Sequence, residues 1–157
     1  MTPEQLLYKI NAYLNQLIPA EPQSLYDPVR AALSSGGKRI RPTLTALAAG
    51  DAPESAWLPA AAAVELLHAF TLVHDDIMDN AETRRGSPTV HIAFGINAAI
   101  LSGDVIVALA TETLSRAPNA GEMLAEFSAG FRAVCEGQAL DKDFEERDDV
   151  SKEEYLT

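Results

Sequence analysis

Residues 65–79 place the strongest constraint on the fold, because they form a long apolar stretch without glycine or proline, E-L-L-H-A-F-T-L-V-H-D-D-I-M-D. Apolar side chains such as Leu66, Phe70 and Val73 recur at helical spacing. This pattern predicts a buried helix. The same stretch carries two histidines and ends in three carboxylates within five residues. The sequence therefore combines a core helix with a cluster of chemically active side chains.

The carboxylates at the end of this stretch are Asp75, Asp76 and Asp79. Asp75 and Asp79 are four residues apart, so they project from one helix face with Cβ atoms about 5–6 Å apart, and Asp76 faces the neighbouring side. Like charges this close repel unless a cation lies between them. The alternative to a metal site is an acidic helix end exposed to water. Negative side chains at a helix C-terminus are disfavoured by the helix dipole, which counts against this alternative. Mg²⁺ prefers oxygen ligands, and substrate phosphates usually complete its coordination shell. The three residues are therefore candidate magnesium ligands.

The composition bounds the class of protein. The chain has 157 residues, of which 47% are hydrophobic, enough for one domain with a core. A net charge of −11 argues against a nucleic-acid partner bound through a basic surface. The single cysteine, Cys135, fits a reducing compartment such as the cytoplasm. We expect no signal peptide, because the N-terminus has no apolar h-region. We also expect no transmembrane segment, because the uncharged residues 86–103 contain proline, histidine and asparagine.

The expected secondary structure is helical throughout, which predicts an all-α fold. Thr2 is expected to cap the first helix, with Pro3 at its first position. A break is expected at residues 34–37 and a polar loop at 80–88. We find no strand of any length. The expected helices span 2–18, 24–33, 43–49, 54–79, 89–94, 97–115 and 122–144.

Five of the twelve basic residues form two tight groups, Lys38, Arg39 and Arg41 in one and Arg84 and Arg85 in the other. The first group lies where a helix begins, and unpaired backbone N–H groups there favour an anion, so Lys38 and Arg41 predict a phosphate site. The alternative is two solvated basic loops. Magnesium ligands beside arginines indicate a diphosphate site, and two basic groups suggest two diphosphates.

Three motifs in this order carry a resemblance: G-G-K-R-I-R-P at 36–42, the stretch 65–79, and R-R-G-S-P-T-V-H at 84–91. The sequence resembles the trans-isoprenyl diphosphate synthases, the polyprenyl synthetase family, and the likeness continues through G-D at 103–104 and G-Q-A-L-D at 137–141. The resemblance implies an antiparallel helical bundle of the isoprenoid synthase type around a deep cavity, usually in a homodimer. It also implies a Mg²⁺-dependent prenyltransferase that condenses an allylic diphosphate with isopentenyl diphosphate to a C15–C20 product, as farnesyl and geranylgeranyl diphosphate synthases do.

The resemblance assigns roles to the motif residues. Asp75, Asp76 and Asp79 match the aspartate-rich motif that binds Mg²⁺ on the allylic diphosphate, and Arg84 matches the arginine that helps to hold this diphosphate. These four are the expected catalytic residues. His68 has a second reading as an ordinary core histidine. The residues that match the isopentenyl diphosphate site are Lys38, Arg41, His68 and Arg85.

Further residues are assigned by the same resemblance. Gln138 and Asp141 match the later G-Q-x-x-D motif, which faces the same cavity, although Gln138 could also be a packing amide. Phe70 lies five residues before Asp75, and its ring resembles the cavity floor that limits product length in short-chain members. Thr71 beside it is small and would leave the cavity open above that floor.

The sequence departs from the family at its later end. The family has a second aspartate-rich motif and a Lys-Thr segment before it, and neither occurs here; residues 148–152, D-D-V-S-K, lack the fifth acid. We therefore expect residues 1–157 to be the N-terminal part of a polyprenyl synthetase domain, inactive alone. One alternative is a non-catalytic regulatory or partner subunit of a complete synthase. A class I terpene cyclase shares D-D-x-x-D, but it has no second diphosphate to hold.

Overall fold

The computed structural model describes residues 2–34 and 36–156 and divides the chain into two compact units, Met1–Gly121 and Glu122–Thr157. Residue Ser35 in the predicted break at 34–37 lies outside the described residues. Almost all of the described secondary structure is helical, which confirms the all-α prediction. The helices of the first unit are α1 (Pro3–Leu17), α2 (Gln23–Ser34), α3 (Ile40–Ala48), α4 (Glu54–Met78), α5 (Val90–Phe94) and α6 (Ile96–Ser115).

The start of α1 follows the sequence prediction. Pro3 occupies its first position, where the missing N–H has no helical partner in any case. The backbone N–H of Gln5 donates to the Thr2 hydroxyl, and the N–H of Thr2 donates to the Gln5 side chain at 2.9 Å. This reciprocal pair is a capping box, so the predicted cap at Thr2 is confirmed.

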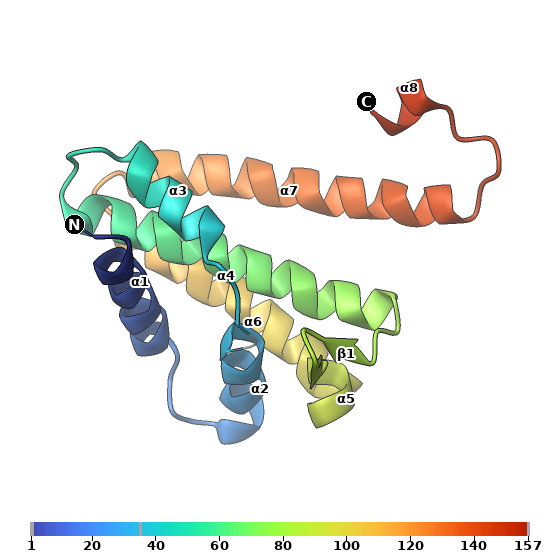
Figure 1. The fold of residues 1–157 in the computed structure, drawn as a ribbon, viewed down its shortest axis with the longest axis horizontal. Helices are drawn as coiled ribbons and strands as arrows, with labels where there is room; N and C mark the ends of the chain where they lie inside the picture. The colour runs from blue at the N-terminus through green and yellow to red at the C-terminus, as the bar shows by residue number, and fades with distance from the viewer. Residues whose placement is uncertain (1, 35, 157) are drawn as a thin grey trace. The chain divides into compact units, whose positions relative to one another are not determined.

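The core of the first unit lies between α4 and α6, which run side by side (Figure 1). Leu66 and Val73 of α4 are buried, as the apolar pattern predicts, and α6 contributes Ala99 and Ile106. Burying a side chain such as Leu66 or Ile106 completely contributes about 1.5–3 kcal/mol. The remaining helices of the unit pack less extensively against these two. They are α1, α2, α3 and α5.

One glycine sets how closely α4 and α6 approach. A Cβ atom added at Gly103 would lie 2.2 Å from Nε2 of His74, a distance that real Cβ atoms do not show. The His74 ring therefore occupies the space that any other residue at position 103 would need. Small residues at a helix crossing allow this kind of close packing.

Helices α4 and α6 are also long and apolar enough to cross a membrane by length and composition. About half of the most apolar window of each, 56% and 44%, is buried inside the protein. Core helices satisfy the same criterion, so the two helices are weak evidence for a membrane span.

The region after α4 differs from the prediction of a plain loop at 80–88. Strands β1 (Thr83–Arg84) and β2 (Ser87–Pro88) pair antiparallel, with Arg84 opposite Ser87. Arg85 (φ 53°) and Gly86 (φ 82°) form the turn with positive φ at both positions, which matches the twist of a hairpin. Two-residue strands are too short to show alternating polarity, so the sequence pattern contains no strand signal.

The second unit contains most of α7 (Ala120–Glu145) and the short α8 (Lys152–Tyr155), which the sequence did not predict. The Ser151 hydroxyl caps α8 by accepting from the Glu154 N–H at 3.1 Å. Arg147 pairs with Asp149 and Glu154 near α8. In the first unit, α3 begins at Ile40, three residues earlier than predicted.

Candidate functional site

A cavity of about 310 Å³ lies in the first unit where the segment between α2 and α3 faces α4. Apolar parts of its wall come from Ala69 and Leu72. The structure brings together here four residues that the sequence analysis assigned to one anion site, from three separate stretches of chain: Lys38, Arg41, His68 and Arg85. Arg39 lines the same cavity, so four basic side chains and an imidazole surround it, an environment suited to a diphosphate.

The glycine segment and the hairpin turn approach each other at this cavity. Gly37 has φ 152°, and a Cβ atom on it would lie 2.8 Å from Nη1 of Arg85. The bare backbone of Gly37 thus leaves room for the Arg85 guanidinium, which reaches the cavity from the hairpin. This approach explains how the two basic groups of the sequence meet.

The surroundings of His68 favour the neutral form of its imidazole. Burial lowers the pKa of His68 from its ordinary value of 6.5, the Arg41 charge lowers it further, and Glu65 opposes both. The imidazole is therefore neutral at neutral pH, and it can donate one hydrogen bond to a bound anion without adding charge.

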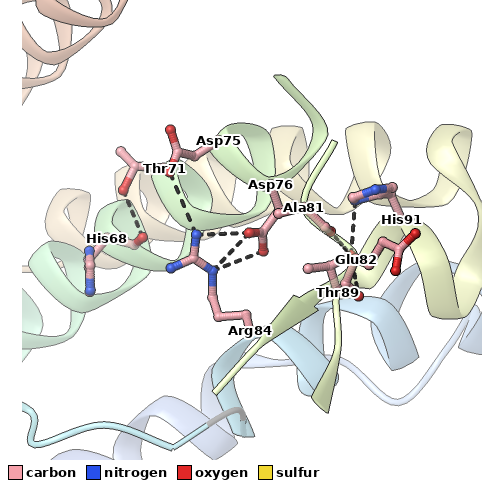
Figure 2. Close-up of polar contacts among 9 residues, drawn as sticks. All are labelled: His68, Thr71, Asp75, Asp76, Ala81, Glu82, Arg84, Thr89 and His91. Carbon is pink, nitrogen blue, oxygen red and sulfur yellow. Dashed lines mark hydrogen bonds and ion pairs between the residues drawn. The ribbon is translucent and has the colours of Figure 1, made fainter. Parts of the chain in front are cut away.

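Arg84 is fixed by carboxylates at the end of α4, as the dashed lines in Figure 2 show. Its Nε donates to both oxygens of Asp76, at 2.9 and 3.0 Å, and its Nη2 lies 2.8 Å from Oδ1 of Asp76 and 3.6 Å from Oδ2 of Asp75. The Asp76 side chain is only 5% exposed. Hydrogen bonding to Asp76 raises the pKa of Arg84, so this guanidinium is a permanent cation.

The three carboxylates consequently occupy different environments. Asp76 is buried and accepts hydrogen bonds from Arg84, Asp75 is half-buried, and Asp79 is exposed at the end of α4. Among the described residues 2–34 and 36–156, no three His, Cys, Asp or Glu side chains converge as a metal site. Two carboxylates on one helix face still fit Mg²⁺, which keeps several waters and takes substrate phosphates as ligands.

Hydrogen bonds that sequence reasoning missed close the base of the hairpin that follows α4. The buried Thr89 donates from its hydroxyl to the Ala81 carbonyl at 2.7 Å, and its N–H donates to the Glu82 carbonyl at 3.1 Å. Nδ1 of His91 lies 3.2 Å from the same hydroxyl. These contacts, drawn in Figure 2, fix the hairpin base beside Arg84. The motif T-V-H at 89–91 contains two of the residues involved, but the sequence does not show which groups they contact.

Comparison with known proteins gives the family. The Polyprenyl synthetase family matches residues 22–157. This chain belongs to the polyprenyl synthetase family. It is 43% identical to the geranylgeranyl diphosphate synthase of Methanosarcina mazei, over 94% of this chain and 48% of the relative. It is 46% identical to a short chain isoprenyl diphosphate synthase of Methanocaldococcus jannaschii, over 98% of this chain and 48% of the relative.

Solved structures give the same family fold. A crystal structure of a geranylgeranyl pyrophosphate synthase superposes with a TM-score of 0.94 at 42% identity, covering 99% of this chain and 49% of that one. The enzyme from the archaeon Geoglobus acetivorans gives 0.91 at 42% identity, covering 98% and 52%. The chain therefore spans about half the length of the curated relatives that it matches. The family resemblance and the isoprenoid synthase fold expected from the sequence are confirmed.

The candidate chain-length residues Phe70 and Thr71 lie about one turn before the carboxylates on α4. Phe70 is half-buried, and its ring centroid lies 4.4 Å from that of His74. His74 Nε2 is buried without a hydrogen-bond partner in the described structure. The Thr71 hydroxyl donates to the His68 carbonyl at 2.8 Å, so it is turned to its own helix.

Two predicted site residues of the polyprenyl synthetase pattern belong to the second unit. Gln138 is half-buried and Asp141 exposed, and both lie on α7. Their spacing of three residues puts them on one face of that helix. Their role at the cavity stays a prediction.

Proposed function

We propose that residues 1–157 form the N-terminal part of a Mg²⁺-dependent short-chain prenyltransferase. The reaction would condense an allylic diphosphate with isopentenyl diphosphate to a C15–C20 prenyl diphosphate. The observation that carries the proposal is the cavity lined by Lys38, Arg41, His68 and Arg85. Membership of a family whose relatives are named as geranylgeranyl diphosphate synthases supports this substrate class.

In this proposal the cavity holds the diphosphate of isopentenyl diphosphate. Lys38, Arg41 and Arg85 supply positive charge, and the neutral His68 donates a hydrogen bond. Because these groups already surround the cavity, little rearrangement is needed when the anion binds. Gln138 and Asp141 are proposed to take part in substrate binding, as the family pattern implies.

The allylic diphosphate would lie beside the end of α4. Asp75 and Asp79 are the proposed direct ligands of Mg²⁺, which neutralises charge on the departing diphosphate when it is bound. The third predicted metal residue, Asp76, would act by holding Arg84, whose guanidinium stabilises the same leaving group.

The proposed reaction needs no protein nucleophile. The allylic carbon–oxygen bond breaks as the diphosphate leaves, the isopentenyl double bond forms the new carbon–carbon bond, and a proton is lost. Phe70 is the proposed floor for the growing chain, with the small Thr71 above it. We also propose a cytoplasmic location and pairing either as a homodimer or with a second chain.

A chimera tests this function. The chain would be joined after residue 157 to the remaining part of the Methanosarcina mazei relative, and turnover would be measured with radiolabelled isopentenyl diphosphate, an allylic diphosphate and Mg²⁺. We expect C15–C20 products from the chimera and none from the 157-residue chain. A folded chimera without products would contradict the prenyltransferase proposal, whereas products from the short chain alone would contradict the need for further residues.

The same assay separates the alternative of a regulatory or partner subunit. The short chain would be added to the complete Methanosarcina mazei enzyme. A change in the rate or in the product length of that enzyme would favour the subunit role, which the half-length match to relatives leaves as the second candidate.

A further inference from the structure

Arg39 stands between Lys38 and Arg41 in the sequence, yet its side chain is directed into the protein and is only 15% exposed. Its Nη1 donates to Oε1 of Glu65 at 2.5 Å, its Nε donates to Oδ1 of Asn11 at 3.0 Å, and its Nη2 donates to the Leu33 carbonyl at 2.7 Å. The planar guanidinium thus joins α1, α2 and α4 at one point.

Glu65 gives this contact its significance. Its carboxylate is 7% exposed and belongs to the wall of the basic cavity, three residues before His68 on α4. An unpaired carboxylate in that wall would repel a bound diphosphate and would itself be costly to bury. Arg39 also lines the cavity, but its guanidinium is engaged by Glu65 and compensates the charge of that carboxylate.

The backbone of Arg39 shows why its position matters for its neighbours. Arg39 has φ 48° and ψ 39°, a left-handed conformation that is unfavourable for a residue with a side chain. Such a conformation persists where surrounding contacts enforce it. The Thr43 hydroxyl and N–H both donate to the Arg39 carbonyl, which ties this residue to the first turn of α3. Lys38 and Arg41 lie on either side of this fixed point.

We propose that Arg39 and Glu65 form a positioning pair that sets the segment 36–41 so that Lys38 and Arg41 face a bound diphosphate. This inference rests on the proposed function of the cavity as a diphosphate site. Arg39 is a positioning residue and not an anion ligand, and Asn11 of α1 takes part from outside the cavity wall.

Three variants test the pair in the 157-residue chain. R39K keeps the positive charge, but one ammonium group cannot donate to Asn11, Glu65 and Leu33 in the geometry of a guanidinium. N11A removes a neutral acceptor and leaves every charge of the cavity unchanged. The matched control is N15A, an exposed position on the same helix. Circular dichroism would check that each variant is folded.

The affinity for inorganic pyrophosphate would be measured by isothermal titration calorimetry, and the amide cross-peaks of residues 36–41 by NMR. We expect R39K to weaken binding about tenfold, N11A to weaken it several-fold with shifted cross-peaks, and N15A to change neither. Parental affinity and unshifted cross-peaks in both R39K and N11A would overturn the positioning role. If R39K does not fold, N11A decides alone.

Failure of the underlying function has a different signature. A parent chain that binds no pyrophosphate would contradict the diphosphate site itself. The cross-peaks of residues 36–41 would then test the positioning pair without any ligand. Cross-peaks displaced in N11A but not in N15A would support the pair, and unchanged cross-peaks in N11A would overturn it.

Discussion

Replacing Asp76 by asparagine removes one charge and keeps the shape of a side chain that the sequence grouped with the metal ligands. In the structure this carboxylate accepts three close contacts from Arg84, between 2.8 and 3.0 Å. The amide of asparagine can accept only on its oxygen, and its NH₂ group would face the N–H groups of Arg84. We expect the substitution to disrupt the pair.

The size of the effect follows from burial. Removing one partner of a fully buried ion pair costs about 3–5 kcal/mol. The Asp76 side chain is 5% exposed but that of Arg84 is 29% exposed, so water can solvate the remaining guanidinium in part. We therefore expect a loss of about 2–3 kcal/mol, close to the value of a hydrogen bond to a charged group. The control D79N changes an exposed carboxylate and should stay within about 0.5 kcal/mol of the parent.

The single tryptophan makes the measurement direct. Trp57 is 6% exposed and lies on α4, the helix that carries Asp76, so its fluorescence reports unfolding of the first unit. Urea denaturation would be followed at this residue for the parent, D76N and D79N. A D76N variant as stable as D79N would refute the reasoning, because Arg84 would then not depend on Asp76, and Asp76 would become a candidate direct metal ligand.

Three further predictions concern the proposed site. In the chimera, D75A and D79A should each lower kcat and kcat/KM in Mg²⁺-dependent turnover, and turnover within a few-fold of the parent would mean that the helix end is only solvated acid. F70A in the chimera should lengthen the product and, because the ring is half-buried, cost less than the roughly 3–5 kcal/mol of a core phenylalanine; chromatography of dephosphorylated products and urea denaturation check both. Because burial and nearby arginines lower the pKa of His68 below 6.5 in the folded chain, the unfolded chain takes up the proton first, so stability should be lost as the pH falls below 6.5. Urea denaturation about one pH unit above and about one unit below 6.5 would measure this loss, which should be smaller in H68Q than in the parent. Equal losses of stability in H68Q and the parent would contradict the assignment.

The sequence predicted well the features that depend on local spacing. The capped start of α1 and the core helix α4 follow from residue order alone, and α4 ends at Met78, one residue before its predicted end. The separation of Asp76 from the face of Asp75 also follows from helical periodicity. The convergence of Lys38 and Arg85 on one cavity was anticipated through the family pattern, not through spacing.

The features that sequence reasoning missed depend on contacts between distant residues. Nothing in the run of basic residues distinguishes Arg39, which is half-buried against Glu65, from Lys38, which is exposed at the cavity. The partner of Asp76 could not be derived either, because Arg84 reaches it only through a hairpin whose strands are two residues long. Which member of a charged cluster turns inward is decided by packing, and periodicity carries no information about it.

The close approach at Gly103 has a consequence for variation of this protein. Any side chain at position 103 must displace the His74 ring, and the Phe70 ring rests on His74 with centroids 4.4 Å apart. A substitution at Gly103 is therefore transmitted from α6 through two rings on α4 to the proposed floor. The effects of changes at 103 and 70 should be non-additive, so that neither position can be redesigned for product length independently of the other.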